Sequence, residues 1–308
     1  MKFILFPPGL INYPTTTQPW ESSMTVADVA RVVKTADTLG YDYVTMPDHI
    51  VIDREHADIL GTKWPEAIAT LGYFAAITER IAMYTSVLVV PYRHPAHIAK
   101  GFSTIDWLSG GRLALAVGVG HSQAEFDALN VPYEHRGPMT DEYLLAVKEL
   151  WTKEEATFHG DHVSFDGMIC DPAPVQKPHP PIYVGGNTKA AMRRAAALGD
   201  GWHPWTVPPS EVPAAIEYMH EQPGLRDNPR PFDIVMPMSR LNVDDRTHVD
   251  QGETFFPDSR EEVLDELGTL KELGTTIALT YFPPTPSLDH FLERLTWFAE
   301  EIMPSFRD

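Results

Sequence analysis

The chain repeats one local pattern, in which an amphipathic helix ends at a glycine and a short β-rich run follows. In residues 26–39 the apolar side chains recur with helical spacing, and Thr25 and Asp28 have the spacing of a capping box. Gly40 follows as a helix-ending residue, and the run YDYVTM comes directly after it. The same order recurs in three further segments, 104–120, 193–205 and 261–282. The fold is therefore expected to alternate helices with strands.

Four more β-rich runs bring the expected strands to eight, namely 2–6, 80–90, 181–186 and 232–242. Strands that alternate with helices form parallel sheets through right-handed crossovers. Eight such units predict an α/β fold of the (β/α)8 TIM-barrel type, and an open doubly wound sheet is the alternative. The segment GVGHSQ at 118–123 lacks the third glycine of the nucleotide-binding fingerprint that the open sheet would carry.

A length of 308 residues suits a single barrel domain, 1–308, with one embellishment. Residues 155–167 contain two alternating runs on either side of Gly160 and Asp161, which predicts a β-hairpin. The proline-rich run CDPAPVQKPHPP follows it and suits neither a helix nor a central strand. We expect residues 153–180 to form an insertion between the fourth and fifth units.

The composition limits the partners of the protein. Against 24 Lys and Arg stand 43 Asp and Glu, and the net charge of -19 repels phosphate backbones and anionic membranes. No run approaches the roughly 18 apolar residues of a membrane span, and the apolar start is shorter than the roughly 7 residues of a signal peptide core. A lone cysteine, Cys170, allows no internal disulfide. We expect a cytoplasmic protein that acts on a small molecule, with neither nucleic acid nor a membrane as partner.

In a barrel of this type the active site lies at the carboxyl ends of the strands. The second expected strand runs into MPDHI, which places Asp48 and His49 there. Other groups at expected strand ends are Ser86, His121, Gly185, Gly186, Asn187, Thr188, His203, Arg240 and Tyr281. These groups form hydrogen bonds and include no cage of carboxylates. A metal-dependent hydrolase on the same barrel is the weaker alternative, because such sites use His-x-His on the first strand and the expected first strand, KFILFPPG, carries no metal ligand.

Two glycine-containing turns at this end suggest contacts with a ligand. The amides of Gly186, Asn187 and Thr188 stand at the start of an expected helix, where they favour an anion such as phosphate, and Lys189 and Arg193 follow within two turns. A tight strand-to-helix turn is the other explanation for these residues. The glycines in GVGHS at 118–122 fit either the close approach of a planar ligand or turn geometry.

Four segments carry a family resemblance in the same order along the chain. They are MPDHI, TSVLVVPYRHPAHIAKGFSTIDWLSGGRLALAVGVG, EFDALNVPYEHRGPMTDEYL and PPIYVGGNTKAAMRRAAALGDGWHP. Over roughly residues 2–300 the chain resembles the luciferase-like monooxygenase superfamily, and within it the branch that uses the deazaflavin coenzyme F-420. The resemblance implies a TIM barrel with a hairpin insertion, a tricyclic flavin or deazaflavin lying across the barrel mouth, and a homodimer.

The resemblance also implies roles for single residues. It places a cis peptide bond between Ser86 and Val87, whose bulge backs the ring of the cofactor. It puts His49 beside the reactive ring carbon, where an imidazole can exchange a proton as a hydride moves. The sugar-phosphate dehydrogenases of this branch have a glutamate where this chain has His121, which argues against glucose 6-phosphate as the substrate. Independently of the resemblance, Arg93 and His94 precede Pro95 on the mouth side and are candidates to meet an acidic cofactor tail.

We therefore expect an oxidoreductase that transfers a hydride between coenzyme F-420 and a small organic substrate. An FMN-dependent monooxygenase and a non-catalytic flavin-binding protein are the alternatives. The expected catalytic residues are His49 and, as its competitor, His121, and no metal is expected. The expected cofactor-binding residues are Asp48, Ser86, Val87, Gly118, Gly120, Gly185, Gly186, Asn187 and Thr188.

Overall fold

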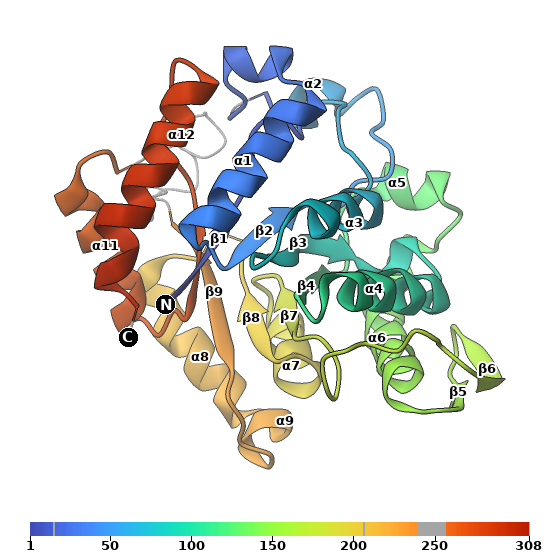
Figure 1. Cartoon of the computed structure of the whole chain (residues 1–308). Helices are drawn as coiled ribbons and strands as arrows, with labels where there is room; N and C mark the ends of the chain where they lie inside the picture. Colours follow the sequence, from blue (N-terminus) through green and yellow to red (C-terminus); the bar gives the residue numbers. More distant parts are fainter. Residues whose placement is uncertain (15, 206, 239–256, 308) are drawn as a thin grey trace.

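Eight parallel strands close into a barrel in the computed structural model, which describes residues 1–14, 16–205, 207–238 and 257–307 (Figure 1). Around the barrel the strands lie in the order β1, β10, β9, β8, β7, β4, β3, β2. Their bounds are β1 Lys2–Leu5, β2 Tyr43–Met46, β3 Ala82–Val89, β4 Leu113–Gly118, β7 Ile182–Gly185, β8 Gly201–His203, β9 Asp233–Pro237 and β10 Ile277–Thr280. The prediction of a TIM barrel is confirmed, and the open-sheet alternative is wrong.

Helices follow the strands and cover the outside of the barrel (Figure 1). They are α1 Val26–Leu39, α2 Ala57–Leu60, α3 Ala67–Ile77, α4 Pro95–Ser109, α5 Gln123–Ala128, α6 Arg136–Thr152, α7 Lys189–Leu198, α8 Val212–Glu221, α9 Pro223–Arg226, α11 Arg260–Glu272 and α12 Leu288–Trp297. The capping box of Thr25 and Asp28 begins α1, and Gly40 ends it with a left-handed φ of 84°. Local sequence thus sets the boundaries of this helix as expected.

The hairpin is present as a separate two-stranded sheet of β5 Ala156–His159 and β6 Ser164–Met168. It lies between α6 and β7, which is the expected place. The carboxylate of Glu142 on α6 accepts hydrogen bonds from three consecutive turn amides, those of Asp161, His162 and Val163. One carboxylate thereby satisfies backbone donors that the hairpin itself leaves unpaired.

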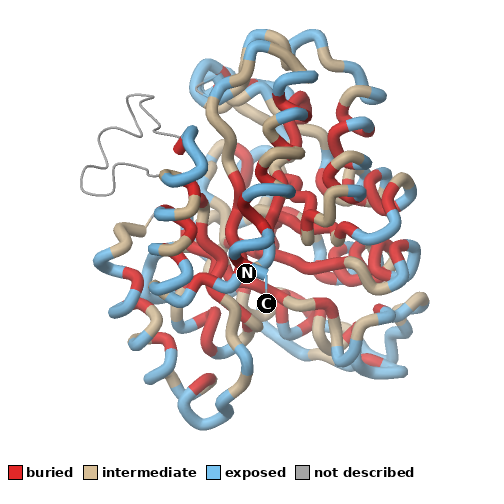
Figure 2. The backbone as a smooth tube through the Cα atoms, turned by 60° about the vertical axis from the view of Figure 1, so that its left-hand side comes forward, coloured by how far each residue is buried: buried red, intermediate tan, exposed pale blue. Residues whose placement is uncertain are grey.

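Side chains fill the inside of the barrel, because alternate residues of each strand point inward. The inward cluster consists of Ile4, Tyr43, Tyr84, Ala114, Ala116, Tyr183, Val235, Ile277 and Leu279. Large residues stand opposite small ones in the register, Tyr84 opposite Ala114 and Tyr183 opposite Ala116. The eight barrel strands are accordingly buried along most of their length, in the red centre of the molecule (Figure 2). A packed interior leaves the strand ends as the place for a ligand.

The expected seventh strand, 232–242, is confirmed over β9, whereas Arg240 lies outside the described residues.

At the other end of the barrel the ammonium group of Met1 donates to the carbonyl of Phe306 at 2.7 Å, so the two ends of the chain lie close together. Among the residues described, no helix combines the length and the apolar character needed to cross a membrane.

Candidate active site

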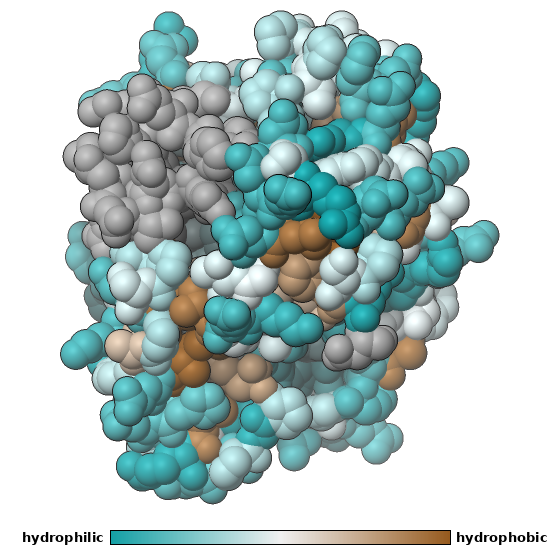
Figure 3. All heavy atoms as spheres, turned by 90° about the vertical axis from the view of Figure 1, so that its left-hand side faces the viewer, coloured by the Kyte–Doolittle hydropathy of each residue, from teal (hydrophilic) through white to brown (hydrophobic). Residues whose placement is uncertain are grey.

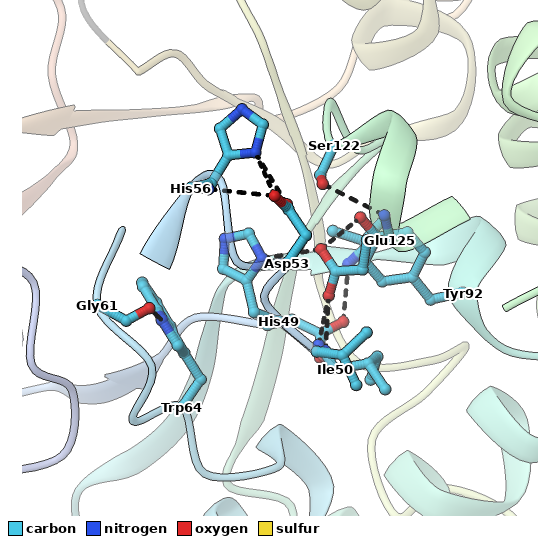
Figure 4. A network of polar contacts seen from close by, with 12 residues as sticks. His49, Ile50, Asp53, His56, Gly61, Trp64, Tyr92, Ser122 and Glu125 are labelled. Atoms are coloured by element: carbon cyan, nitrogen blue, oxygen red, sulfur yellow. Dashed lines mark hydrogen bonds and ion pairs between the residues drawn. The ribbon is translucent and has the colours of Figure 1, made fainter. Parts of the chain in front are cut away.

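His49 is held at the barrel mouth by a buried carboxylate (Figure 4). It follows β2, and its Nδ1 lies 2.9 Å from Oε2 of Glu125 on α5. The same oxygen accepts a hydrogen bond from the hydroxyl of Tyr92 at 2.8 Å. Oε1 of Glu125 accepts from the amides of Ile50 and Val51, which follow His49 directly. Glu125 thus fixes both the ring of His49 and the backbone that carries it.

These contacts determine the charge on Glu125 and the tautomer of His49. Burial acts to raise the pKa of Glu125, but hydrogen bonds from His49, Ile50 and Tyr92 outweigh it, and the pKa is lowered. An ionised carboxylate only accepts hydrogen bonds, so Nδ1 of His49 must carry a proton. When the ring is neutral, Nε2 is then free to accept a proton from a bound molecule.

A loop between β2 and α3 completes the surroundings of His49. The indole of Trp64 lies 4.6 Å from the imidazole of His49, measured between ring centres (Figure 4). The amides of Thr62 and Lys63 donate to Oδ1 of Asn12, in the segment after β1. Gly61 has a φ of 72°, and a Cβ there would lie 2.2 Å from the carbonyl oxygen of Asn12. Only glycine permits this close approach of the two loops.

His121 also reaches the mouth, as expected, with its ring centre 5.9 Å from that of His49. The hydroxyl of Tyr133 donates to the backbone carbonyl of His121 at 3.2 Å. Among the described residues no side chain forms a hydrogen bond with the His121 ring. Because a carboxylate fixes the tautomer of His49 but not that of His121, the geometry favours His49 as the group that handles a proton.

Asp48, a residue expected to bind the cofactor, forms a buried ion pair. Its side chain is fully buried, and the guanidinium of Arg93 spans both carboxylate oxygens at 2.7 and 2.8 Å. The amide of Val89 donates to it as well. Arg93 makes a second ion pair, with Glu66, at 2.7 Å. Asp48 therefore joins the ends of β2 and β3, and Arg93 is already neutralised by two carboxylates.

The peptide bond between Ser86 and Val87 is cis, as the resemblance implies. The register of β3 against β4 shifts between Thr85 and Leu88, which marks a bulge at these two residues. A Cβ on Gly118 would lie 2.8 Å from the side chain of Val87, and one on Gly185 would lie 3.0 Å from it. These two glycines therefore make room for Val87, which fills the space between the ends of β4 and β7.

Gly120 is explained by turn geometry and packing. Its φ is 78°, and a Cβ would meet the side chains of Val89 and Phe126 at 2.7 and 2.8 Å. A requirement for glycine thus arises from the protein's own packing at this position.

The turn after β7 matches the expectation only in part. Thr188 is the N-cap of α7, and its side chain accepts a hydrogen bond from the amide of Ala191. The amide of Gly186 is not free, because it donates to the carbonyl of His203 at 3.3 Å. The side chain of Asn187 accepts from the amide of Trp205. Any anion at this turn would therefore meet the first turn of α7, beyond Gly186.

His94, Lys189 and Arg193 have local partners. Nδ1 of His94 caps α4 by accepting from the amide of Ala96. Arg193 donates to the hydroxyl of Tyr218 at 3.1 Å, and the ammonium of Lys189 lies 5.3 Å from the centre of the same ring. The two cations that were expected beside an anion thus contact α8.

A further histidine, His203, lies deeper in the mouth. It ends β8 and is buried, with Nδ1 2.8 Å from the hydroxyl of Tyr84 and Nε2 3.4 Å from Oγ of Ser86. Burial lowers the pKa of His203 to about 4, so its ring is neutral at ordinary pH.

Glu125 is the residue that the sequence analysis missed. Ser122 and Glu125 have the spacing of a capping box, and Ser122 does cap α5. The carboxylate of Glu125, however, crosses to the segment after β2. The sequence pattern around Glu125 therefore indicates the start of a helix and gives no sign of the tertiary contact.

Within the described ranges, no three His, Cys, Asp or Glu side chains gather as a metal ion would require.

Three proteins of known sequence illustrate what this chain is similar to. A protein of Mycobacterium tuberculosis (strain ATCC 25618 / H37Rv) is 29% identical over 289 residues, which cover 88% of this chain and 93% of that one. The FMNH(2)-dependent dimethylsulfone monooxygenase of Pseudomonas putida is 36% identical over 141 residues, or 45% of this chain and 38% of that one. The F420-dependent glucose-6-phosphate dehydrogenase of Microbacterium testaceum (strain StLB037) is 34% identical over 173 residues, or 54% of this chain and 49% of that one.

Solved structures share the whole fold at low identity. A monooxygenase from Streptomyces bottropensis superposes with a TM-score of 0.77 at 19% identity, covering 100% of both chains. An F420-dependent secondary alcohol dehydrogenase in complex with an F420-acetone adduct superposes with a TM-score of 0.75 at 21% sequence identity, covering 100% of this chain and 99% of that one. Residues 1–247 match the sequence family of luciferase-like monooxygenases. With this match over most of the barrel, the chain belongs to the luciferase-like monooxygenase family.

Proposed function

We propose that this protein is an oxidoreductase that transfers a hydride between coenzyme F-420 and a small organic substrate. The observation that carries the proposal is the pairing of His49 with buried Glu125 at the mouth of a luciferase-like barrel. Hydride transfer to or from an alcohol or carbonyl requires a proton to move at the oxygen, and a positioned imidazole serves that purpose. A protein that only binds a flavin has no need of this pair.

The residues at the mouth fit a planar ring. Val87 fills the space beside Gly118 and Gly185, so no large side chain rises from these two strand ends. Coenzyme F-420, when bound, supplies the ring carbon that carries the hydride.

The protein's own side chains would then act as follows. The Glu125 carboxylate keeps the proton of His49 on Nδ1 and leaves Nε2 to accept one from a substrate hydroxyl, or to return it in the reverse direction. Trp64 covers one side of His49 and limits water there. The first turn of α7 is the place for a phosphate group of the cofactor.

Binding of purified cofactors tests the proposal. We expect F-420 to bind with micromolar or lower Kd and FMN, in its oxidised and reduced forms, at least about tenfold more weakly, which corresponds to about 1.4 kcal/mol. An FMN-dependent monooxygenase is the second candidate, favoured by the match to the Pseudomonas putida enzyme. Equal affinities, or tighter binding of FMN, would favour that candidate and contradict ours.

A further inference from the structure

His203, Tyr84 and Ser86 form a chain of hydrogen bonds from the packed interior of the barrel to its mouth. Tyr84 belongs to the inward cluster and is fully buried. Its hydroxyl lies 2.8 Å from Nδ1 of His203, and Nε2 on the other side of that ring lies 3.4 Å from Oγ of Ser86. Ser86 is half-buried and is the first residue of the cis peptide bond.

The direction of this chain follows from its buried end. Nδ1 of His203 is the one hydrogen-bond partner that the described part of the chain offers to the Tyr84 hydroxyl. Burial raises the pKa of Tyr84 well above its usual value, so the phenol keeps its proton. A protonated phenol can donate or accept, but with Nδ1 as its one partner within the described residues its buried hydrogen is satisfied only if it donates, so Nδ1 is the acceptor. A neutral imidazole carries one N–H, which must be on Nε2, facing Ser86.

We infer that the chain from Tyr84 through His203 orients the Ser86 hydroxyl as a hydrogen-bond donor toward the molecule bound at the mouth. Ser86 Oγ accepts from His203, so its own hydrogen is left for a carbonyl oxygen or ring nitrogen of that molecule. His203 is thus a positioning residue that acts through Ser86. The inference rests on the proposed function only for the identity of the ring; the direction of the chain is a property of the protein alone.

Nuclear magnetic resonance of the cofactor-free protein tests the direction. In protein labelled with ¹⁵N-histidine, long-range proton–nitrogen correlations at neutral pH should show His203 with a bare Nδ1 and a protonated Nε2. The signals are assigned as those missing from His203→Gln. Tyr84→Phe removes the donor and should weaken the preference for this tautomer. A proton on Nδ1 in the wild-type protein would overturn the inference, whatever cofactor the protein uses.

A double-mutant cycle on F-420 affinity tests the consequence. Ser86→Ala should weaken binding by about tenfold through the loss of one hydrogen bond. His203→Leu should weaken it to a similar degree, and the double variant should be no worse than either single one. His203→Gln keeps an amide N–H near Nε2 and should recover part of the loss. If the affinity loss of the double variant equals the product of the two single losses, the two residues act independently and the inference is overturned. Each variant is first checked for the wild-type circular dichroism spectrum.

The two proposals fail differently. If the wild-type protein binds FMN better than F-420, the proposed function fails, and the same cycle is then measured with FMN. If it binds neither, the tautomer of His203 alone decides the inference.

Discussion

At the scale of single residues, His49 owes its orientation to a carboxylate 76 positions further along the chain. Both side chains are largely shielded, with 12% of His49 and 1% of Glu125 exposed. In such surroundings a charged hydrogen bond is stronger than in water, and it fixes one tautomer. His121 lies nearby, and no carboxylate among the described residues forms a hydrogen bond with its ring. The two histidines are therefore not equivalent.

The first prediction separates the two histidines. His49→Ala should lower turnover by about 100-fold or more, because a positioned acid–base group contributes about that much. F-420 affinity should change far less. His121→Ala is the matched substitution and should have a smaller effect on turnover. Steady-state kinetics decide between the roles. A larger loss of turnover in His121→Ala than in His49→Ala would show that His121 is the acid–base group. A change confined to KM in His49→Ala would show that His49 takes no part in catalysis.

The second prediction concerns Glu125. Glu125→Gln keeps the shape of the side chain but removes the charge that fixes His49, and turnover should fall by about 10- to 100-fold. Glu134→Gln, at an exposed position outside the contacts of His49, is the matched control and should leave turnover unchanged. Wild-type turnover in both variants would show that Glu125 has no part in positioning His49.

The third prediction uses the low pKa of His203, about 4 against about 6.5 for an ordinary histidine. Between these values the unfolded chain binds a proton that the folded protein does not, so stability is fully present above about pH 6.5 and is lost as the pH falls toward 4. The loss amounts to about 3 kcal/mol. Urea unfolding at several pH values should show this fall in the free energy of unfolding in the wild-type protein and not in His203→Gln. The same pH dependence of the free energy of unfolding in both proteins would contradict the prediction.

At the scale of elements, the bulge in β3 packs against glycines at the ends of two other strands, β4 and β7. Val87 occupies space that side chains at Gly118 and Gly185 would need. The alternation of β-rich residues predicted the strands, but it gave no sign that two glycines and a valine from three strands fit together. Such a fit depends on register and closure, which the barrel sets as a whole.

The fourth prediction tests this fit. Gly118→Ala should lower the free energy of unfolding by about 1 to 3 kcal/mol, because its Cβ would overlap Val87. In a Val87→Ala background the same substitution should cost much less, which chemical denaturation would reveal as a coupling energy. Gly268→Ala on α11 is the control: it has open space and should stabilise the helix slightly. Equal costs in both backgrounds would contradict the fit.

At the scale of the whole molecule, acidic charge dominates. The face in Figure 3 is largely hydrophilic, and its apolar side chains lie in small separate areas. Each chain carries a net charge of -19, so two copies repel each other at long range. Any association must therefore overcome this repulsion, which dissolved salt screens.

The fifth prediction is that the protein is a homodimer, as its family resemblance implies, and that salt strengthens the dimer. Light scattering should give twice the 34.5 kDa mass of one chain. Dissociation on dilution should become easier as the salt concentration falls, because the Debye length grows. A monomer at all salt concentrations would contradict the prediction.

The sequence by itself determined the alternation of helices and strands, the helix caps, the hairpin and the end of the barrel where a site is expected. These follow from local propensity and periodicity, which neighbouring residues carry. Only the tertiary structure decided that Glu125 pairs with His49, that Arg93 neutralises Asp48, and that the amide of Gly186 donates to His203. Each of these contacts joins residues at or beyond the ends of different strands. Their geometry exists only once the barrel has closed, because closure brings those ends together.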